Sequence, residues 1–139
     1  MLLDILGAHV YGFRGRIMGI SIDVLAPELK ALVTELAEST AEFLGLDRPS
    51  LADRVEVNAD YLGGGYGVLG DNERRAIDLV ARLEGIALDP VYTGRAMGGL
   101  LDIIARGVFQ DNERILFWHT GGTPALFADK YRSAIGSSS

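Results

Sequence analysis

The chain has 139 residues, of which 48% are hydrophobic, so it is long enough to bury the core of one compact domain. Its 19 acidic residues outnumber its 13 basic residues, and no basic cluster occurs, which argues against a nucleic-acid partner. It contains no cysteine, which excludes disulfides, thiolate metal sites and a cysteine nucleophile.

The first segment, residues 2–11, has the pattern of the later turns of a helix, and no capping residue starts it. We expect its apolar residues to face a part of the fold that precedes the chain; these are Leu2, Leu3, Ile5 and Leu6. The segment is too short to span a bilayer and carries no basic leader. We therefore expect a soluble, cytoplasmic protein that does not contact a membrane.

Strand-like and helix-like patterns alternate along the next part of the chain. Residues 16–22 are short and nearly continuously apolar, which predicts a strand covered on both faces. Pro27 then opens a predicted amphipathic helix that ends near Gly45. We expect its inward face to consist of Leu29, Leu32, Val33, Leu36, Phe43 and Leu44. Residues 55–57 are a weak strand candidate.

Glycine marks the boundaries of the following elements. Four glycines within residues 63–67 predict a loop rather than a regular element. Asp71 is expected to cap the next helix and Gly85 to end it. The inward face of that helix is expected to be Ile77, Val80 and Ala81. Residues 85–88 are a short strand candidate, and a further helical pattern over residues 96–104 ends at Gly107.

The last third contains the clearest strand pattern of the chain, residues 114–118, in which we expect Trp118 to be a core residue. A short helix is predicted around Leu126. Strands that alternate with helices of this length predict an α/β fold with a mostly parallel sheet and helices on both faces. Without a visible internal boundary, we expect a single α/β domain over residues 1–136, followed by a polar tail over residues 137–139.

Three loops are candidate sites, because ligands of open parallel sheets bind beyond the carboxyl ends of the strands. They are residues 63–67 with Tyr66, residues 89–94 with Tyr92, and residues 119–122. Each also has a plain structural interpretation: glycines serve turns, His119 is a hydrogen-bonded structural histidine, and the tyrosines pack at loops. The sequence has no metal-ligand spacing, so no metal is expected, and it has no dinucleotide fingerprint, P-loop or nucleophile elbow.

Two longer segments resemble a known family. Residues 89–100, DPVYTGRAMGGL, and residues 116–127, LFWHTGGTPALF, closely resemble the end of the D-cysteine desulfhydrase and 1-aminocyclopropane-1-carboxylate deaminase family. The loop at residues 61–67 and the strand at residues 15–22 fit the same family, so the resemblance covers nearly all of the chain after about Gly12. It implies the carboxy-terminal portion of a pyridoxal-phosphate enzyme with a tryptophan-synthase-beta-like fold (fold type II), in which the cofactor lies between two α/β halves.

The resemblance also implies roles for single residues. Tyr92 would stack on or beside the cofactor ring, Thr120 would place its hydroxyl near the pyridine nitrogen, and Tyr66 would face the substrate carbon that exchanges a proton. The implied catalytic pair is Tyr66 and Tyr92, and the implied cofactor-binding set is Tyr92, Thr93, Thr120, Gly121 and Gly122. In the deaminase branch a glutamate follows the tyrosine, where this chain has Thr93, and this difference favours the desulfhydrase branch.

The implied function is that of a lyase that converts D-cysteine or a related β-substituted amino acid to pyruvate and ammonia by β-elimination. L-cysteate sulfo-lyase and aminocyclopropane-carboxylate deaminase activities are the alternative substrate interpretations.

The family holds its cofactor through a lysine, but the only lysines here are Lys30 and Lys130, and neither lies in the Ser-Gly-Asn-Lys context that the family uses. The phosphate-binding glycine-threonine loop would precede Met1. We therefore expect weak or absent pyridoxal-phosphate binding and no catalysis by the chain alone. The alternative function is a non-catalytic remnant or a binding or assembly module. Because a sheet cut at its middle exposes an unpaired edge, we expect a homo-oligomer or a partner that supplies the missing amino-terminal half.

Overall fold

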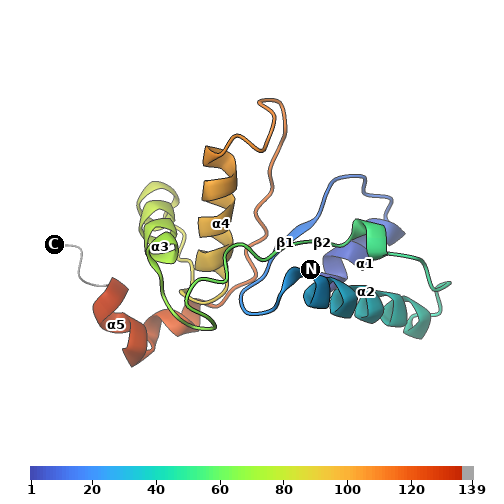
Figure 1. The fold of residues 1–139 in the computed structure, drawn as a ribbon, viewed down its shortest axis with the longest axis horizontal. Coiled ribbons are helices and arrows are strands. Elements are labelled where there is room, and N and C mark those ends of the chain that lie inside the picture. The colour runs from blue at the N-terminus through green and yellow to red at the C-terminus, as the bar shows by residue number, and fades with distance from the viewer. Residues whose placement is uncertain (136–139) are drawn as a thin grey trace. The chain divides into compact units, whose positions relative to one another are not determined.

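The structure, a computed structural model, describes residues 1–135 (Figure 1). The expected polar tail at residues 137–139 lies outside the described residues. Contacts between residues divide the chain into two compact units, unit 1 from Met1 to Ala59 and unit 2 from Asp60 onward. The expected single domain over residues 1–136 stays a prediction.

Unit 1 is a small α/β unit. Its elements are α1 (Leu2–Val10), β1 (Met18–Ile20), α2 (Ala26–Phe43), the 3-10 helix η1 (Ala52–Arg54) and β2 (Glu56–Asn58). The two strands pair in parallel, with Gly19 opposite Val57. Parallel neighbours need a crossover connection, and α2 lies within the segment that provides it. The strands predicted at residues 16–22 and 55–57 and the helix that begins near Pro27 are thereby confirmed as elements. However, β1 spans only three residues and is half-buried, so the prediction that this strand is covered on both faces was wrong.

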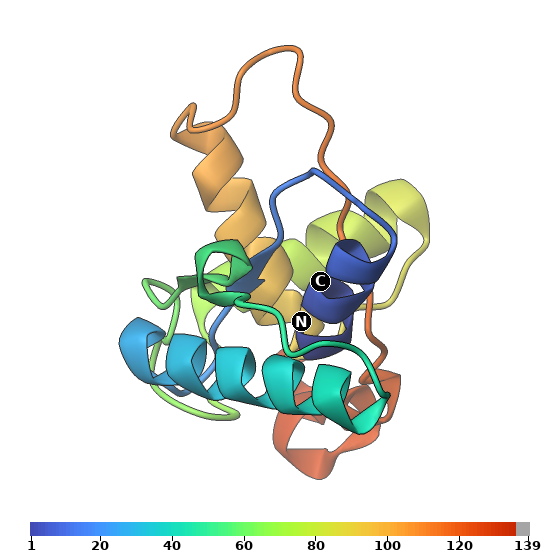
Figure 2. The same cartoon turned by 90° about the vertical axis from the view of Figure 1, so that its right-hand side faces the viewer.

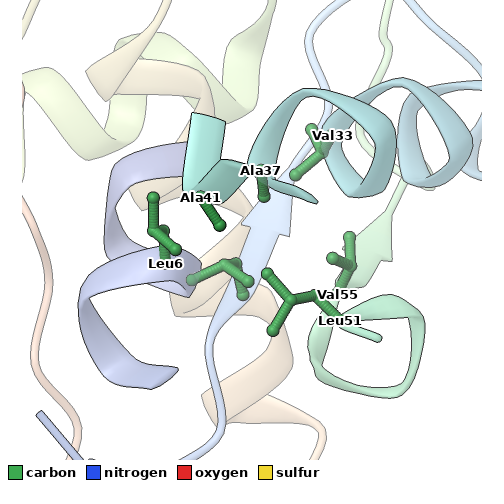
Figure 3. Packing of buried hydrophobic residues seen from close by; sticks show 7 residues of the cluster. Leu6, Val33, Ala37, Ala41, Leu51 and Val55 are labelled. Atoms are coloured by element: carbon green, nitrogen blue, oxygen red, sulfur yellow. The ribbon is translucent and has the colours of Figure 1, made fainter. Parts of the chain in front are cut away.

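The core of unit 1 forms where α1, α2 and the segment around η1 meet (Figure 3). Its buried residues are Ile5, Leu6, Val33, Ala37, Ala41, Leu51 and Val55. The α2 residues of this set recur every four positions, so they form one stripe, and their small side chains let α1 approach closely.

Two predictions about the apolar faces of unit 1 are corrected. Ile5 and Leu6 lie in this core with 0% and 4% exposure, so they do not face a preceding part of the fold, whereas Leu3 of the same predicted face is 71% exposed. Conversely, Leu32, Leu36 and Phe43 of the predicted inward face of α2 are 53%, 48% and 88% exposed. The reason is that α2 has two apolar stripes, and only the stripe with small residues packs within unit 1.

Unit 2 consists of helices and long loops. Its elements are α3 (Asp71–Glu84), α4 (Thr93–Ala105), the 3-10 helix η2 (Thr123–Phe127) and α5 (Asp129–Ile135). Helices α3 and α4 pack side by side (Figure 1). Gly98 permits this approach, because a Cβ atom there would lie 3.0 Å from the carbonyl oxygen of Asn72.

The predicted ends and inward face of α3 are largely confirmed. Gly85 ends the helix in the left-handed conformation, with φ of 67°. At the other end the cap is Gly70 rather than Asp71, which is the first helical residue. Ile77 and Val80 are buried as predicted, whereas Ala81 is exposed and Ala76 takes its place.

Two predicted strands of unit 2 do not form, at residues 85–88 and 114–118. Residues 108–122 run as an open loop between α4 and η2 (Figure 1, Figure 2). Leu116 and Trp118 are 81% and 67% exposed, so Trp118 is not a core residue. A strand needs a neighbour for its backbone hydrogen bonds, and within the described part of unit 2 there is none.

The α/β class with parallel strand pairing is confirmed by β1 and β2. The short helix expected around Leu126 is the 3-10 helix η2. Among the helices that the structure describes, none has the length and apolar character needed to cross a membrane.

Candidate functional site

Two of the expected site residues, Tyr66 and Tyr92, meet in unit 2. Their hydroxyl oxygens lie 2.5 Å apart, and their rings are in an edge arrangement with centroids 6.1 Å apart. Tyr66 comes from the glycine loop, and Tyr92 immediately precedes α4. Both side chains remain accessible, with residue exposures of 57% and 44%. The pair therefore presents two phenols to solvent from loops that are 26 residues apart in sequence.

The buried carboxylate of Asp89 fixes the turn that carries Tyr92. One oxygen accepts hydrogen bonds from the N–H groups of Val91 and Tyr92 at 2.7 and 2.8 Å. The other accepts from the N–H and the hydroxyl of Thr93, both at 2.7 Å. Burial by itself raises the pKa of Asp89, but these hydrogen bonds outweigh it and hold the pKa below its usual value.

Thr93 is part of this turn. It is 2% exposed, and its hydroxyl also accepts a hydrogen bond from the Asp89 N–H at 2.8 Å. The hydroxyl is therefore engaged on both its donor and acceptor sides by Asp89. The cofactor contact implied for Thr93 stays a prediction.

The guanidinium of Arg95 holds the loop that carries Tyr66. One terminal nitrogen donates to the carbonyl oxygens of Leu62 and Gly65 at 2.7 and 3.1 Å, and the other donates to that of Val68 at 2.7 Å. Its Nε donates to Glu73 at 2.6 Å, an ion pair in which both side chains are at most 5% exposed. The other Glu73 oxygen accepts the Gly70 N–H at 3.0 Å.

The third expected loop reaches the same turn. A Cβ atom on Gly122 would lie 2.6 Å from the Asp89 carboxyl carbon, so only glycine fits there, at a φ of 95°. His119 Nε2 lies 3.1 Å from the Ala87 carbonyl oxygen, and its Nδ1 accepts the Gly121 N–H. This agrees with the structural interpretation of the histidine.

Thr120 lies between His119 and Gly121, whose hydrogen bonds are described above. Its side chain is exposed, and the hydrogen bond that joins Tyr66 to Tyr92 does not include it. The structure thus joins the two tyrosines directly and sets Gly122 beside the same turn, while the role implied for Thr120 stays a prediction.

A cavity of about 310 Å³ lies elsewhere in unit 2, at the amino-terminal end of α3. Its lining residues are Asp60, Tyr61, Gly63, Gly70, Asp71, Asn72, Glu73, Arg95 and Gly99, a set that includes neither site tyrosine. Because Glu73 and Arg95 neutralise each other there, we place the candidate site at the tyrosines and not in this cavity.

Neither lysine has the surroundings of a cofactor anchor. Lys30 is exposed on α2 of unit 1. Lys130 is exposed on α5, with its Nζ 5.3 Å from the ring centroid of Tyr131 and close to Gly67. Within residues 1–135, no three His, Asp or Glu side chains gather in a way that could hold a metal ion.

The sequence patterns pointed to the loops but missed the residues that hold them, Asp89, Glu73 and Arg95. One signal was available. Arg95 is the only charged residue between Asp89 and Asp102. A single charge in such an apolar helical segment indicates a partner of opposite charge if the segment is buried.

Comparison with known proteins supplies the class. A crystal structure of an ACC deaminase homologue matches 98% of this chain with a TM-score of 0.81 and 33% sequence identity. The chain covers 39% of that protein. No family model matches the chain. The fold is therefore that of part of a tryptophan-synthase-beta-like enzyme of fold type II.

The curated relatives define the family more closely. The 1-aminocyclopropane-1-carboxylate deaminases of Methylobacterium nodulans and Burkholderia vietnamiensis are 41% and 37% identical over 115 and 124 residues. These alignments cover 83% and 89% of this chain, but only 34% and 37% of the relatives. The chain is therefore similar in sequence and fold to one part of the 1-aminocyclopropane-1-carboxylate deaminases, and it spans about a third of the length of these relatives.

Proposed function

We propose that the chain is the carboxy-terminal part of a pyridoxal-phosphate-dependent lyase that acts on D-cysteine or a related β-substituted amino acid. The overall reaction consumes D-cysteine and water and releases pyruvate, ammonia and hydrogen sulfide. Catalysis requires a lysine-bearing portion that lies outside these 139 residues, in a longer protein or on a partner chain. The proposed setting is the cytoplasm.

The observation that carries the proposal is the contact between the hydroxyls of Tyr66 and Tyr92. Two accessible phenols joined by a hydrogen bond can pass a proton to or from a substrate carbon and keep the donor oriented. The proposal gives the proton-transfer role to Tyr66. Tyr92 flanks the ring, and its hydroxyl orients the phenol of Tyr66.

The residues present fit one side of the cofactor but not its covalent anchor. Gly121 has open space where a Cβ would project, so a planar ring can approach the backbone there. Thr120, beside it, would offer a neutral hydroxyl to the ring nitrogen. When bound, the cofactor supplies the stabilisation of negative charge at the substrate carbon. Lys30 and Lys130 do not fit as anchors, so we assign no covalent step to this chain.

Deamination of 1-aminocyclopropane-1-carboxylate is the second candidate, because the curated relatives described above carry that name. The two activities differ in their products, since ring opening of the four-carbon substrate yields 2-oxobutanoate and ammonia. Thr93 favours the first candidate. A glutamate follows the tyrosine in the deaminase branch, whereas here a short hydroxyl side chain is bound to Asp89.

The test reconstitutes the enzyme. The chain is fused to, or co-expressed with, the portion of the M. nodulans deaminase that it does not match, and products from both substrates are measured. Tyr66→Phe and Tyr92→Phe are expected to lower kcat about 100-fold with little change in cofactor affinity, because the hydroxyls act mainly in the transition state. Thr120→Val is expected to weaken cofactor binding.

Tyr11→Phe is the matched control, because Tyr11 lies in unit 1 and is 88% exposed. The chain alone, mixed with pyridoxal phosphate, is expected to show no specific absorbance band, and a band removed by Lys130→Ala would contradict this. A reconstituted enzyme that tolerates all three site substitutions would refute the assigned roles. A reconstituted protein that neither binds the cofactor nor turns over either substrate would favour the non-catalytic alternative.

A further inference from the structure

We propose that Arg95 is a positioning residue that sets the phenol of Tyr66 at a fixed place relative to Tyr92. In this proposal the glycine loop and the start of α4 behave as one rigid body, and Arg95 is the link between them. The spatial part stands on the contacts of this chain, and only its kinetic consequence rests on the proposed function.

Arg95 is well placed to link the two tyrosines because it shares a helical turn with one of them. It lies three residues after Tyr92, in the first turn of α4, and the Asp89 carboxylate fixes the entry to that turn. Its guanidinium reaches across to the loop that carries Tyr66. A single side chain therefore connects the backbone that positions Tyr92 to the backbone that positions Tyr66.

Within the loop itself there are two long backbone hydrogen bonds, from the Gly65 N–H to the Leu62 carbonyl at 3.2 Å and from the Val68 N–H to the Gly65 carbonyl at 3.3 Å. Gly63, Gly65 and Gly67 have φ values of 59°, 105° and 68°, a conformation that only glycine adopts readily and that costs much conformational entropy to fix. The carbonyls on both sides of Tyr66 are nevertheless held. Gly65 is bound by Arg95 at 3.1 Å, and Gly67 is bound by the hydroxyl of Tyr131 at 2.6 Å. These anchors fix the direction in which the Tyr66 side chain leaves the loop.

The chemistry of guanidinium explains why arginine serves here. Three separate carbonyls and one carboxylate must be reached from one buried point, and the planar fork of five N–H donors allows this. Lysine carries a similar charge but concentrates its donors on one nitrogen. Glu73 supplies the compensating charge that lets the guanidinium remain buried. Arg95→Lys should therefore keep the positive charge but lose the ability to reach the three carbonyls and Glu73 at the same time.

The first test measures the tyrosine contact in the chain itself. Photo-oxidation with a ruthenium tris-bipyridyl complex and persulfate removes one electron and one proton from each of two adjacent phenols, and a carbon–carbon bond forms between the rings. Mass spectrometry of the monomeric product should find the Tyr66–Tyr92 cross-linked peptide. We expect Arg95→Lys to reduce its yield about threefold or more, because the released loop samples other positions.

Arg82→Lys is the matched control, because Arg82 is exposed and pairs with Asp78 on α3. Its cross-link yield should equal that of the unchanged chain. Tyr131→Phe is the second variant, since it removes only a neutral hydrogen bond to Gly67, and it should lower the yield by a smaller factor. Circular dichroism checks that each variant folds. Unchanged yields in the folded variants overturn the proposal; if Arg95→Lys does not fold, Tyr131→Phe alone decides.

The second test uses the reconstituted enzyme. Arg95→Lys is expected to lower kcat about tenfold with little change in KM, because a misplaced phenol affects the transition state more than substrate binding. In a Tyr66→Phe background the same substitution should cause no further loss. Independent, additive losses overturn the positioning role. A reconstituted enzyme without activity contradicts the proposed function, while the cross-linking result still decides the position of Tyr66.

Discussion

At the scale of the residue, Asp89 is the side chain on which the local geometry most depends. It is fully buried, and its two oxygens receive three backbone N–H groups and one hydroxyl within residues 91–93. We expect Asp89→Asn to destabilise unit 2 by about 2 kcal/mol, because an amide offers one acceptor oxygen and turns an NH₂ group toward donors. Urea unfolding at pH 7 measures this. Asp78→Asn, which changes an exposed carboxylate, should cost far less.

The pH dependence of the same residue has a definite sign. The pKa of Asp89 in the folded chain lies below its ordinary value of 3.8, so the folded state favours the charged form. The carboxylate therefore stabilises the fold at pH values above 3.8, and this contribution is lost as the pH falls below that value toward the folded pKa. Asp89→Asn should flatten this acid limb of the stability profile. If the loss of stability at acid pH is the same in Asp89→Asn, other carboxyl groups cause that loss.

At the scale of the element, α4 shows that a helix can be placed by its glycines. A Cβ atom on Gly94 would lie 2.5 Å from the Asp89 carbonyl oxygen and 3.2 Å from the Ile77 side chain. We expect Gly94→Ala to destabilise the chain by about 2 kcal/mol, although alanine is the better helix former, because the clash involves backbone. Gly7→Ala in α1, where nothing lies within 4 Å, should instead stabilise it by about 0.5–1 kcal/mol. Thermal unfolding should show a lower melting temperature for Gly94→Ala and a higher one for Gly7→Ala than for the unchanged chain.

The success of sequence-based prediction also differs between elements. The helices α2 and α3 are largely predictable because their caps and periodicity are local properties. The strand predicted at residues 114–118 does not form, because a run of apolar and aromatic residues is not sufficient for a strand, which also needs the hydrogen bonds of a neighbouring backbone. The stripe of α2 that is buried, Val33, Ala37 and Ala41, could not be chosen over the larger leucines, because the choice depends on how closely α1 approaches.

At the scale of the whole molecule, the outer stripe of α2 predicts self-association. It consists of Leu32, Leu36 and Phe43, together with Leu25 at the helix cap, and these residues are between 48% and 88% exposed. An apolar stripe of this length favours burial against another surface. We expect a dimer or larger species in sedimentation at micromolar concentration, and we expect the double substitution Leu32→Glu and Leu36→Glu to convert it to monomer.

Leu83→Glu is the control for this prediction, because Leu83 is 70% exposed but lies on α3 of unit 2. It should leave the association unchanged. A monomeric parent chain that binds no hydrophobic dye would contradict the prediction. Dissociation by Leu83→Glu but not by the α2 pair would place the contact on the other unit.

The sequence by itself determined most of the helices and loops, because caps and glycine positions are readable without coordinates, and residues 89–100 and 116–127 carried the resemblance to the family. It also placed Tyr66 and Tyr92 on loops of the candidate site. Only the tertiary structure decided that their hydroxyls touch, and that the Arg95–Glu73 pair holds the loop that carries Tyr66. The physical reason is that these interactions join residues up to 33 positions apart, and their geometry depends on how the helices pack. Local propensity carries no information on such packing.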